Sequence, residues 1–460
     1  MLLSKTIELA ERLALKTKPG YAIALLNRLP PSAISLLQRI RFRETLKLAA
    51  KSEFYSQQFK ARNIDIRKIK HPAELGDFFT TSDDLQKYGA EAFIVNRPDT
   101  AFETTGTTSS LTKRVFFSNR ELNEMGRVSA LGLHQIGLRK DDIVLSAFDV
   151  SFWVSPAVLR TAFQYLGCFH AEAGKIAPAE FYERAARYRP TVIFGEPSWL
   201  VRVSEIADQR GVWPIKFLFA GGENIAEETR HEVERIWNAP FHLNYGQTES
   251  FGVIGVECAE HDGYHRNDPN FFFEIPEINS EGYGELVYTT LTRDVMPLVR
   301  YRSTDVTRMI DDPCKCGLFA KRIAKLKGRV DEMVVCGMGN ISPWVFGEML
   351  SGVDDVTDEW QVRIWHEDLK DVIEILVESD FYDNPMGEES ILTKVKENLR
   401  TKFPDFQKNL EMQLYCLRVS PVRRGSLRTG RKLRRLVVLG EPPKTEVNGN
   451  GHFAGVVHKN

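Results

Sequence analysis

The spacing of hydrophobic residues changes along the chain and predicts regions of different structure. Over residues 1–95, apolar residues recur near a 3.6-residue period with charges between them, as in "ISLLQRIRFRETLKLAAKSEFYSQQF", which predicts a helical N-terminal region. From about 96 to 300, short apolar runs such as "DIVLSAF" and "IKFLFAGG" alternate with amphipathic stretches such as "AEETRHEVERIW". This alternation predicts an α/β fold with layered, mostly parallel sheets and helices.

The pattern changes again at "KLKGRVDEMVVCGMGN", residues 325–340, where glycines flank a short apolar strand. Glycine supplies the positive φ that tight reversals need, so we interpret this segment as a junction. Beyond it, "QVRIWHEDLKDVIEILVE" predicts a hairpin and "ESILTKVKENLRTKF" a helix. We therefore predict a large N-terminal domain over 1–330, a small mobile α+β C-terminal domain over 331–440, and a disordered tail over 441–460.

Composition narrows the classes of function. The 460 residues include 61 basic and 62 acidic side chains, a net charge of -1, which gives no general attraction to nucleic acid. Charged residues interrupt the N-terminal segment, and no run reaches the roughly 18 uncharged apolar residues of a membrane helix. We expect a cytoplasmic protein.

Its six cysteines are too few for a disulfide framework in a chain of this length, so we expect thiols or metal ligands.

A segment rich in hydroxyl groups, "TTGTTSS" at 104–110, suits a loop that wraps phosphate oxygens. Alone, it fits a solvated turn equally well. Other polar motifs follow in order: "FAGGEN", "LNYGQTES", "GELVYTTL", "YRSTDV", "LKGRVDEMV" and "SLRTGRKLRRL". The set is far more specific than any one motif.

In this order, over about residues 35–440, the motifs resemble the adenylate-forming superfamily of acyl-CoA synthetases and adenylation domains. They resemble the phenylacetate-CoA ligase family more closely, because the chain also carries "MPLVRYRSTDVTRM" and a Cys-x-Cys-Gly ahead of "KGRVDEM". The resemblance implies an AMP-forming acid–thiol ligase. In such an enzyme, a carboxylate attacks the α-phosphorus of ATP, and the resulting acyl-adenylate passes its acyl group to coenzyme A.

The resemblance also implies which residues bind the nucleotide. Tyr245 would stack on adenine with Gly246 beside it, and Asp305 would accept hydrogen bonds from both ribose hydroxyls. The loop over the phosphates would consist of Thr104, Thr105, Gly106, Thr107 and Thr108. The wall beside adenine would consist of Gly221, Gly222 and Glu223.

Catalytic roles are implied in the same way. Thr248 would hydrogen-bond the α-phosphate, and Glu249 would hold Mg²⁺, a hard cation that prefers oxygen ligands. Lys432 would bridge the substrate carboxylate and the phosphate; the alternative is that it belongs to a solvated basic run. Arg329 would reach the nucleotide, and Asp331 would be the hinge about which the small domain rotates between the two half-reactions.

Cysteines and histidines in "CAEHDGYH" and "PCKCG" form a second group. Such pairs separated by a long loop can bind Zn²⁺ tetrahedrally, although C-x-C is tighter than the usual C-x₂-C. The resemblance implies a structural zinc ion held by Cys258, His265, Cys314 and Cys316, with His261 as a reserve ligand. The alternative is that these residues are buried without a metal.

The predicted acid pocket combines aromatic side chains that suit an aryl ring with polar ones that suit an amino or hydroxyl substituent. The aromatic residues are Phe152, Trp153 and Phe251, and the polar residues are Asp149, Glu196 and Gln247. Each of them equally fits a core or rim position. We therefore expect an aromatic or related acid as substrate, without naming it.

The predicted phosphate loop departs from the family pattern, with Ser109 in place of its second glycine and Leu111 in place of its proline. The leading hypothesis remains an acid–CoA ligase that uses ATP and Mg²⁺. A second passes the activated group to an amine, a carrier-protein thiol or a diazo-forming nucleophile. A third is a nucleotide-binding module without turnover. A homodimer through the N-terminal helices is compatible with the resemblance, and so is packing of those helices on their own domain.

Overall fold

The computed structural model describes residues 19–26, 30–104, 113–148, 150, 153–222, 225, 227–318, 320–330, 334–336, 339–341, 343–367, 370–403, 407, 410, 415–428, 433 and 435–439. The chain divides into two units, residues 1–224 with 232–325 and residues 225–231 with 326–460. The predicted tail lies outside the described residues.

The first unit is built on a nine-stranded sheet with the order β13-β14-β9-β8-β7-β6-β5-β3-β4. Five neighbouring strands are parallel, namely β3 (Ile143–Ser146), β4 (Phe169–Glu172), β5 (Val192–Gly195), β6 (Phe217–Gly221) and β7 (Phe241–Gln247). The antiparallel strands are β8 (Gly252–Val256), β9 (Tyr264–Arg266), β13 (Met309–Ile310) and β14 (Arg322–Ile323). Strands β5 and β6 are buried at every position, as expected where helices cover both faces of a parallel sheet.

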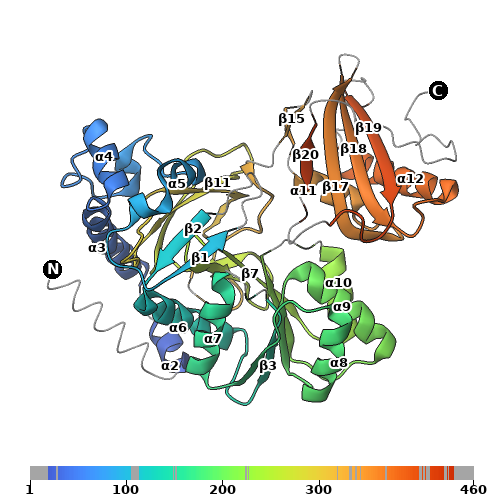
Figure 1. Ribbon diagram of the computed structural model, residues 1–460, viewed down its shortest axis with the longest axis horizontal. Helices are drawn as coiled ribbons and strands as arrows, with labels where there is room; N and C mark the ends of the chain where they lie inside the picture. The colour runs from blue at the N-terminus through green and yellow to red at the C-terminus, as the bar shows by residue number, and fades with distance from the viewer. Residues whose placement is uncertain are drawn as a thin grey trace. The chain divides into compact units, whose positions relative to one another are not determined.

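Helices lie on both faces of this sheet, with α6 and α7 on one side and α8 and α9 on the other (Figure 1). The helices of this part of the chain are α2 (Pro19–Leu26), α3 (Pro31–Ala49), α4 (Glu53–Ala61), α5 (Ser82–Tyr88), α6 (Asn119–Gln135), α7 (Val154–Leu166), α8 (Pro178–Tyr188), α9 (Pro197–Arg210) and α10 (Glu227–Trp237), with short 3₁₀ helices η1 (Pro72–Leu75) and η2 (Ala90–Phe93). The rings of Phe163 in α7 and Phe194 in β5 meet edge to face at 5.0 Å, which joins the helix layer to the sheet.

Two smaller sheets complete the first unit. Strands β1 (Thr100–Thr104) and β2 (Lys113–Phe117) form an antiparallel pair, and β10 (Phe271–Glu274), β11 (Gly284–Thr290) and β12 (Tyr301–Thr307) form a three-stranded antiparallel sheet. Strand β2 leads into α6 through Ser118, whose side chain and Glu121 form a capping box. Such a box fixes where a helix begins.

The second unit has the predicted α+β character. Its four-stranded sheet has the order β19 (Tyr415–Val422), β18 (Lys370–Ser379), β17 (Val356–Glu367) and β20 (Leu436–Val438), beside α11 (Pro343–Leu350), α12 (Pro385–Lys402) and the pair β15 (Val334–Cys336) and β16 (Gly339–Ile341). The predicted hairpin is the antiparallel pair β17–β18. Apolar side chains from both helices and the sheet form one core. The predicted fold class is confirmed.

None of the described helices combines the length and the apolar character needed to cross a membrane.

Candidate functional site

The motif at the carboxyl end of β7 is held by a close approach of two strands. The register of β7 with β8 shifts between Tyr245 and Gly246. A Cβ atom on Gly246 would lie only 2.1 Å from the carbonyl oxygen of Gly252, so a side chain does not fit there. The turn that follows carries Thr248 and Glu249. It therefore lies where parallel sheets commonly bind ligands, at the carboxyl edge of the strands.

Two of the predicted nucleotide-binding residues, Tyr245 and Asp305, share a hydrogen bond although they lie 60 positions apart. The Tyr245 hydroxyl donates to Oδ2 of Asp305, and Nε2 of Gln247 donates to the same oxygen at 2.7 Å. Gln247 Nε2 also donates to the Ser303 carbonyl at 3.0 Å, and its Oε1 accepts from the Tyr288 hydroxyl at 3.0 Å. Gln247, which we predicted in the acid pocket, thus lies inside this network.

Burial raises the pKa of Tyr288 well above its ordinary value, and the nearby Glu249, Tyr245 and Asp305 add to the effect. Its hydroxyl therefore stays protonated and keeps its role as donor to Gln247. This donor orients the amide of Gln247, whose nitrogen then faces Asp305.

Two non-glycine residues in the left-handed backbone region flank the network. They are Phe251, with φ of 74°, and Thr304, with φ of 64°. For a β-branched residue such as Thr304 this conformation is a genuine outlier. The Thr304 amide donates to Oε1 of Glu285 at 2.9 Å, which holds the residue that precedes Asp305. Strain that the surroundings sustain is typical of ligand-binding sites.

Glu249, the predicted magnesium ligand, is buried and ion-paired. Its Oε1 lies 2.7 Å from Nζ of Lys113 and accepts from the Tyr301 hydroxyl at 3.2 Å. Burial acts to raise the pKa of this carboxyl, but the Lys113 ammonium and the hydrogen bonds that the carboxylate accepts together outweigh it, so the pKa lies below its ordinary value. Because Mg²⁺ needs oxygen ligands and an ammonium group contacts this oxygen, the residues around Glu249 do not fit a resident magnesium ion.

The predicted adenine wall and one aromatic residue of the predicted pocket lie together. A Cβ atom on Gly221 would lie 2.5 Å from Oδ1 of Asn244, and one on Gly222 would lie 3.8 Å from the ring of Trp153. Gly222 has φ of 92°, a conformation that favours glycine. The end of β6, the middle of β7 and the start of α7 therefore meet at this point.

Glu196 and Phe251, which we also predicted in the acid pocket, are engaged by other side chains of the protein. Glu196 is buried and forms an ion pair with Lys175. Phe251 is buried and stacks on Phe117, with ring centroids 4.9 Å apart, while the Arg293 guanidinium lies over both rings. The charge of Glu196 is thus balanced within the protein, and the Phe251 ring belongs to a packed aromatic–arginine cluster.

Several predicted residues lie outside the described part of the chain: Thr105, Gly106, Thr107, Thr108, Ser109, Leu111, Asp149, Phe152, Glu223, Asp331 and Lys432. Thr104 ends β1, where its backbone pairs with Lys113 of β2. Arg329 belongs to the second unit.

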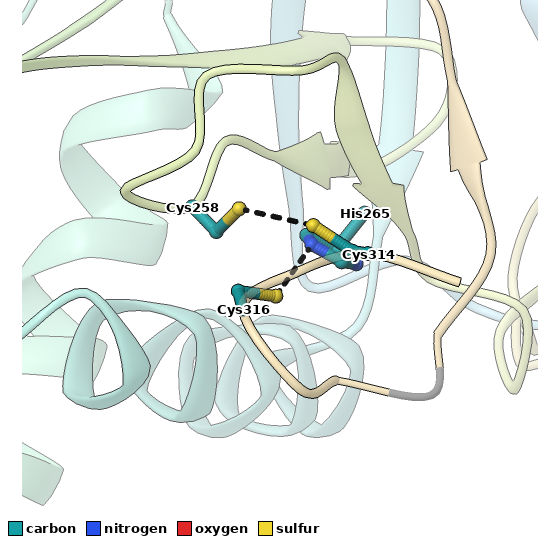
Figure 2. Close-up of side chains that lie close together, drawn as sticks. All are labelled: Cys258, His265, Cys314 and Cys316. Atoms are coloured by element: carbon teal, nitrogen blue, oxygen red, sulfur yellow. Dashed lines mark hydrogen bonds between the residues drawn. The ribbon is translucent and has the colours of Figure 1, made fainter. Parts of the chain in front are cut away.

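The four predicted zinc ligands lie together (Figure 2). Their donor atoms are all within 4.8 Å of one another. Cys258 follows β8, His265 lies in β9, and Cys314 and Cys316 lie in the segment between β13 and β14. The Cys258 and Cys314 sulfurs are 3.6 Å apart, and Cys316 Sγ lies 3.3 Å from Nε2 of His265. Three thiols and one imidazole at this spacing fit the donor set of a tetrahedral zinc site.

The surroundings of His265 support this use. Its Nδ1 lies 2.9 Å from the Ala320 carbonyl, which fixes the ring and leaves Nε2 facing the thiols. Burial lowers the pKa of His265, which favours the neutral imidazole that binds metals. The reserve ligand His261 points elsewhere, because it contacts Glu257 and stacks on His242.

Several residues of the site went unnoticed in the sequence. No motif assigned a role to Lys113, Glu121 or Arg293. Lys113 lies in a basic segment, and Glu121 and Arg293 are charged residues in stretches where we recognised no motif. Tyr288 and Tyr301 stand within the quoted motifs "GELVYTTL" and "YRSTDV". We assigned no role to either of them from the sequence.

Comparison with known proteins defines the class first. A family model described as AMP-binding enzyme matches residues 99–271. The fold is similar to that of a 2-hydroxyisobutyryl-CoA ligase solved in complex with R3-HIB-AMP, with a TM-score of 0.77, 18% identity and coverage of 90% of this chain and 91% of that chain. It is also similar to O-succinylbenzoate coenzyme A synthetase from Bacillus subtilis, with a TM-score of 0.55, 17% identity and coverage of 74% and 69%. At these identities the likeness shows the fold alone.

The relatives found by sequence narrow the class. A phenylacetate-coenzyme A ligase of Thermus thermophilus is 26% identical over 390 residues, covering 81% of this chain and 87% of the relative. A phenylacetate-coenzyme A ligase of Escherichia coli is 23% identical over 364 residues, covering 75% and 82%. The predicted resemblance to the adenylate-forming superfamily, and within it to the phenylacetate-CoA ligases, is therefore confirmed. The prediction that the chain is an enzyme of this AMP-forming type is confirmed with it.

Proposed function

We propose that the protein activates a carboxylic acid with ATP and transfers the acyl group to coenzyme A. In the first step, a carboxylate oxygen attacks the α-phosphorus and pyrophosphate leaves. In the second step, the thiolate of coenzyme A attacks the acyl carbonyl carbon and AMP leaves. The relatives named as phenylacetate-coenzyme A ligases support this assignment.

One observation carries the proposal: Tyr245 and Asp305 share a buried hydrogen bond. In the proposed complex, the Tyr245 ring is the platform for adenine, and Asp305 accepts from the ribose hydroxyls. A platform and an acceptor that hold each other need little reordering when the nucleotide binds, which saves binding free energy. Thr248, in the turn beyond β7, is proposed to donate to the α-phosphate. Lys432 is proposed to bridge the two reacting anions.

The substrate is proposed to be an aromatic or related acid. Trp153, beside Gly222, supports this choice, since its ring lies next to the proposed adenine wall. A flat apolar side chain there suits an aryl group. ATP is proposed to enter as its magnesium complex, in which phosphate oxygens supply the ligands of the metal.

We further propose that Cys258, His265, Cys314 and Cys316 hold a structural zinc ion. Four protein ligands leave no open position for water, so the ion would hold segments of the fold together and take no part in the reaction. The ligands join the β8–β9 region to the β13–β14 connection, next to the pairing of β9 with β14.

The test is a panel of aryl and alkyl acids assayed for acid-dependent pyrophosphate release with and without coenzyme A, with mass-spectrometric detection of thioesters. We expect release with at least one aryl acid and thioester only when coenzyme A is present. Asp305→Ala should weaken ATP binding, whereas Asp77→Ala, at a fully exposed carboxylate, is the matched control. Release without any thioester product would favour an amine, a carrier-protein thiol or a diazo-forming nucleophile as acceptor. No release with any acid would refute the proposal.

A further inference from the structure

The ion pair between Lys113 and Glu249 is almost fully buried. The two side chains are 10% and 8% exposed, and Nζ lies 2.7 Å from Oε1. Lys113 also donates to the Ser82 hydroxyl at 3.0 Å. A buried pair that lost one partner would leave a charge without compensation. The contacts therefore form a preorganised site for one positive charge, which the Lys113 ammonium group occupies.

Four separate segments create this arrangement. Lys113 is the first residue of β2, Ser82 begins α5, Glu249 lies in the turn after β7, and Tyr301 begins β12. The Arg293 guanidinium donates to the Glu249 carbonyl at 3.3 Å and holds its backbone. Each partner of the carboxylate thus comes from a different element, so the carboxylate has little freedom to turn away from the ammonium group.

A divalent ion on this oxygen would compete directly with the lysine. A magnesium ion lies about 2.1 Å from an oxygen ligand, whereas Nζ already stands 2.7 Å from Oε1. Two cations on one oxygen repel each other, and the effect is strong where little water screens it. The metal must therefore either displace the ammonium group or arrive with further negative charge.

We propose that the Lys113 ammonium group is the resident counter-cation of Glu249 and keeps divalent ions off this carboxylate while nucleotide is absent. Magnesium then enters only as its complex with ATP, whose phosphate groups bring the additional negative charge. The inference rests on the proposed function only for the step in which ATP binds. Its test in the nucleotide-free protein is independent of activity.

The test measures binding of Mn²⁺ alone to the full-length protein without nucleotide, through the electron paramagnetic resonance signal of free Mn²⁺. The single variant Glu249→Gln should bind Mn²⁺ as the wild-type protein does. Lys113→Met keeps an unbranched stem and removes the charge, so it should create a Mn²⁺ site. We expect this variant to bind Mn²⁺ about tenfold more tightly than the wild-type protein does, which corresponds to about 1.4 kcal/mol. The double variant Lys113→Met/Glu249→Gln should lack it.

Lys113→Arg is the matched control, because it keeps the positive charge and should bind no additional Mn²⁺. Circular dichroism of each variant checks its fold, and the comparison of wild type with Glu249→Gln tests the inference even if Lys113→Met does not fold. Two results would overturn it: Mn²⁺ binding to the wild type that Glu249→Gln abolishes, or no new site in folded Lys113→Met. Neither result depends on pyrophosphate release, so failure here is distinct from failure of the proposed ligase activity.

Discussion

Replacement of Glu121 by alanine should destabilise the first unit strongly, because this carboxylate neutralises a buried arginine. The side chains of Glu121 and Arg293 are 0% and 1% exposed, and Nε of Arg293 donates to Oε1 of Glu121 at 3.0 Å. The same oxygen accepts from the Asp294 amide at 2.7 Å, and Oε2 accepts from the Ser118 amide at 2.6 Å. Alanine would leave all three donors without this partner.

The magnitude follows from these contacts. Removal of one partner of a buried ion pair costs about 3–5 kcal/mol, because the remaining charge stays desolvated. A domain is stable by only about 5–15 kcal/mol in total, so the loss should be readily visible. Glu121→Gln keeps the shape and one acceptor oxygen, and should cost less, about 1–3 kcal/mol. Arg293 also holds the Glu249 carbonyl, so the damage should extend to the proposed site.

Urea-induced unfolding, followed by tryptophan fluorescence and circular dichroism, measures the change in free energy. Glu124→Ala is the control on the same helix. Glu124 pairs with Arg120 at 3.0 Å, and the side chains are 28% and 41% exposed, so its loss should cost less than about 1 kcal/mol. If Glu121→Ala cost no more than Glu124→Ala, the claim that a buried charge pair supports this unit would be refuted.

Three further predictions concern the site. Cys314→Ser should abolish zinc binding in freshly purified protein, measured by plasma mass spectrometry, whereas Cys168→Ser should retain the bound zinc. A freshly purified wild-type protein without zinc would refute the proposed zinc site. Tyr245→Ala should weaken ATP binding by about tenfold or more in calorimetry, as expected for a lost aromatic platform, and unchanged affinity would contradict that role. The lowered pKa of Glu249 stabilises the fold fully above its ordinary value of 4.5, and this contribution is lost as the pH falls through the lowered pKa. The difference in unfolding free energy between wild type and Glu249→Gln should therefore shrink under acid, and a constant difference would speak against an ionised Glu249.

Local pattern was enough to anticipate the kinds of elements and their order. Alternating apolar runs and amphipathic stretches predicted the α/β unit, and the stretch "QVRIWHEDLKDVIEILVE" predicted the hairpin that forms β17 and β18. Both are properties of neighbouring residues, since the periods of helix and strand repeat within a few positions. The resemblance likewise implied the ligand set Cys258, His265, Cys314 and Cys316, whose donor atoms lie within 4.8 Å of one another in the structure.

The sequence by itself determined these elements, the set of ordered motifs and the resemblance that they carry. Only the tertiary structure decided which charges meet. Lys113 and Glu249 lie 136 positions apart, and Glu121 and Arg293 lie 172 apart. Contacts of this kind depend on strand order and on how β2, α6 and the turn after β7 pack, and no short-range period encodes them. For this reason the resemblance implied magnesium at Glu249, whereas the fold places a lysine there.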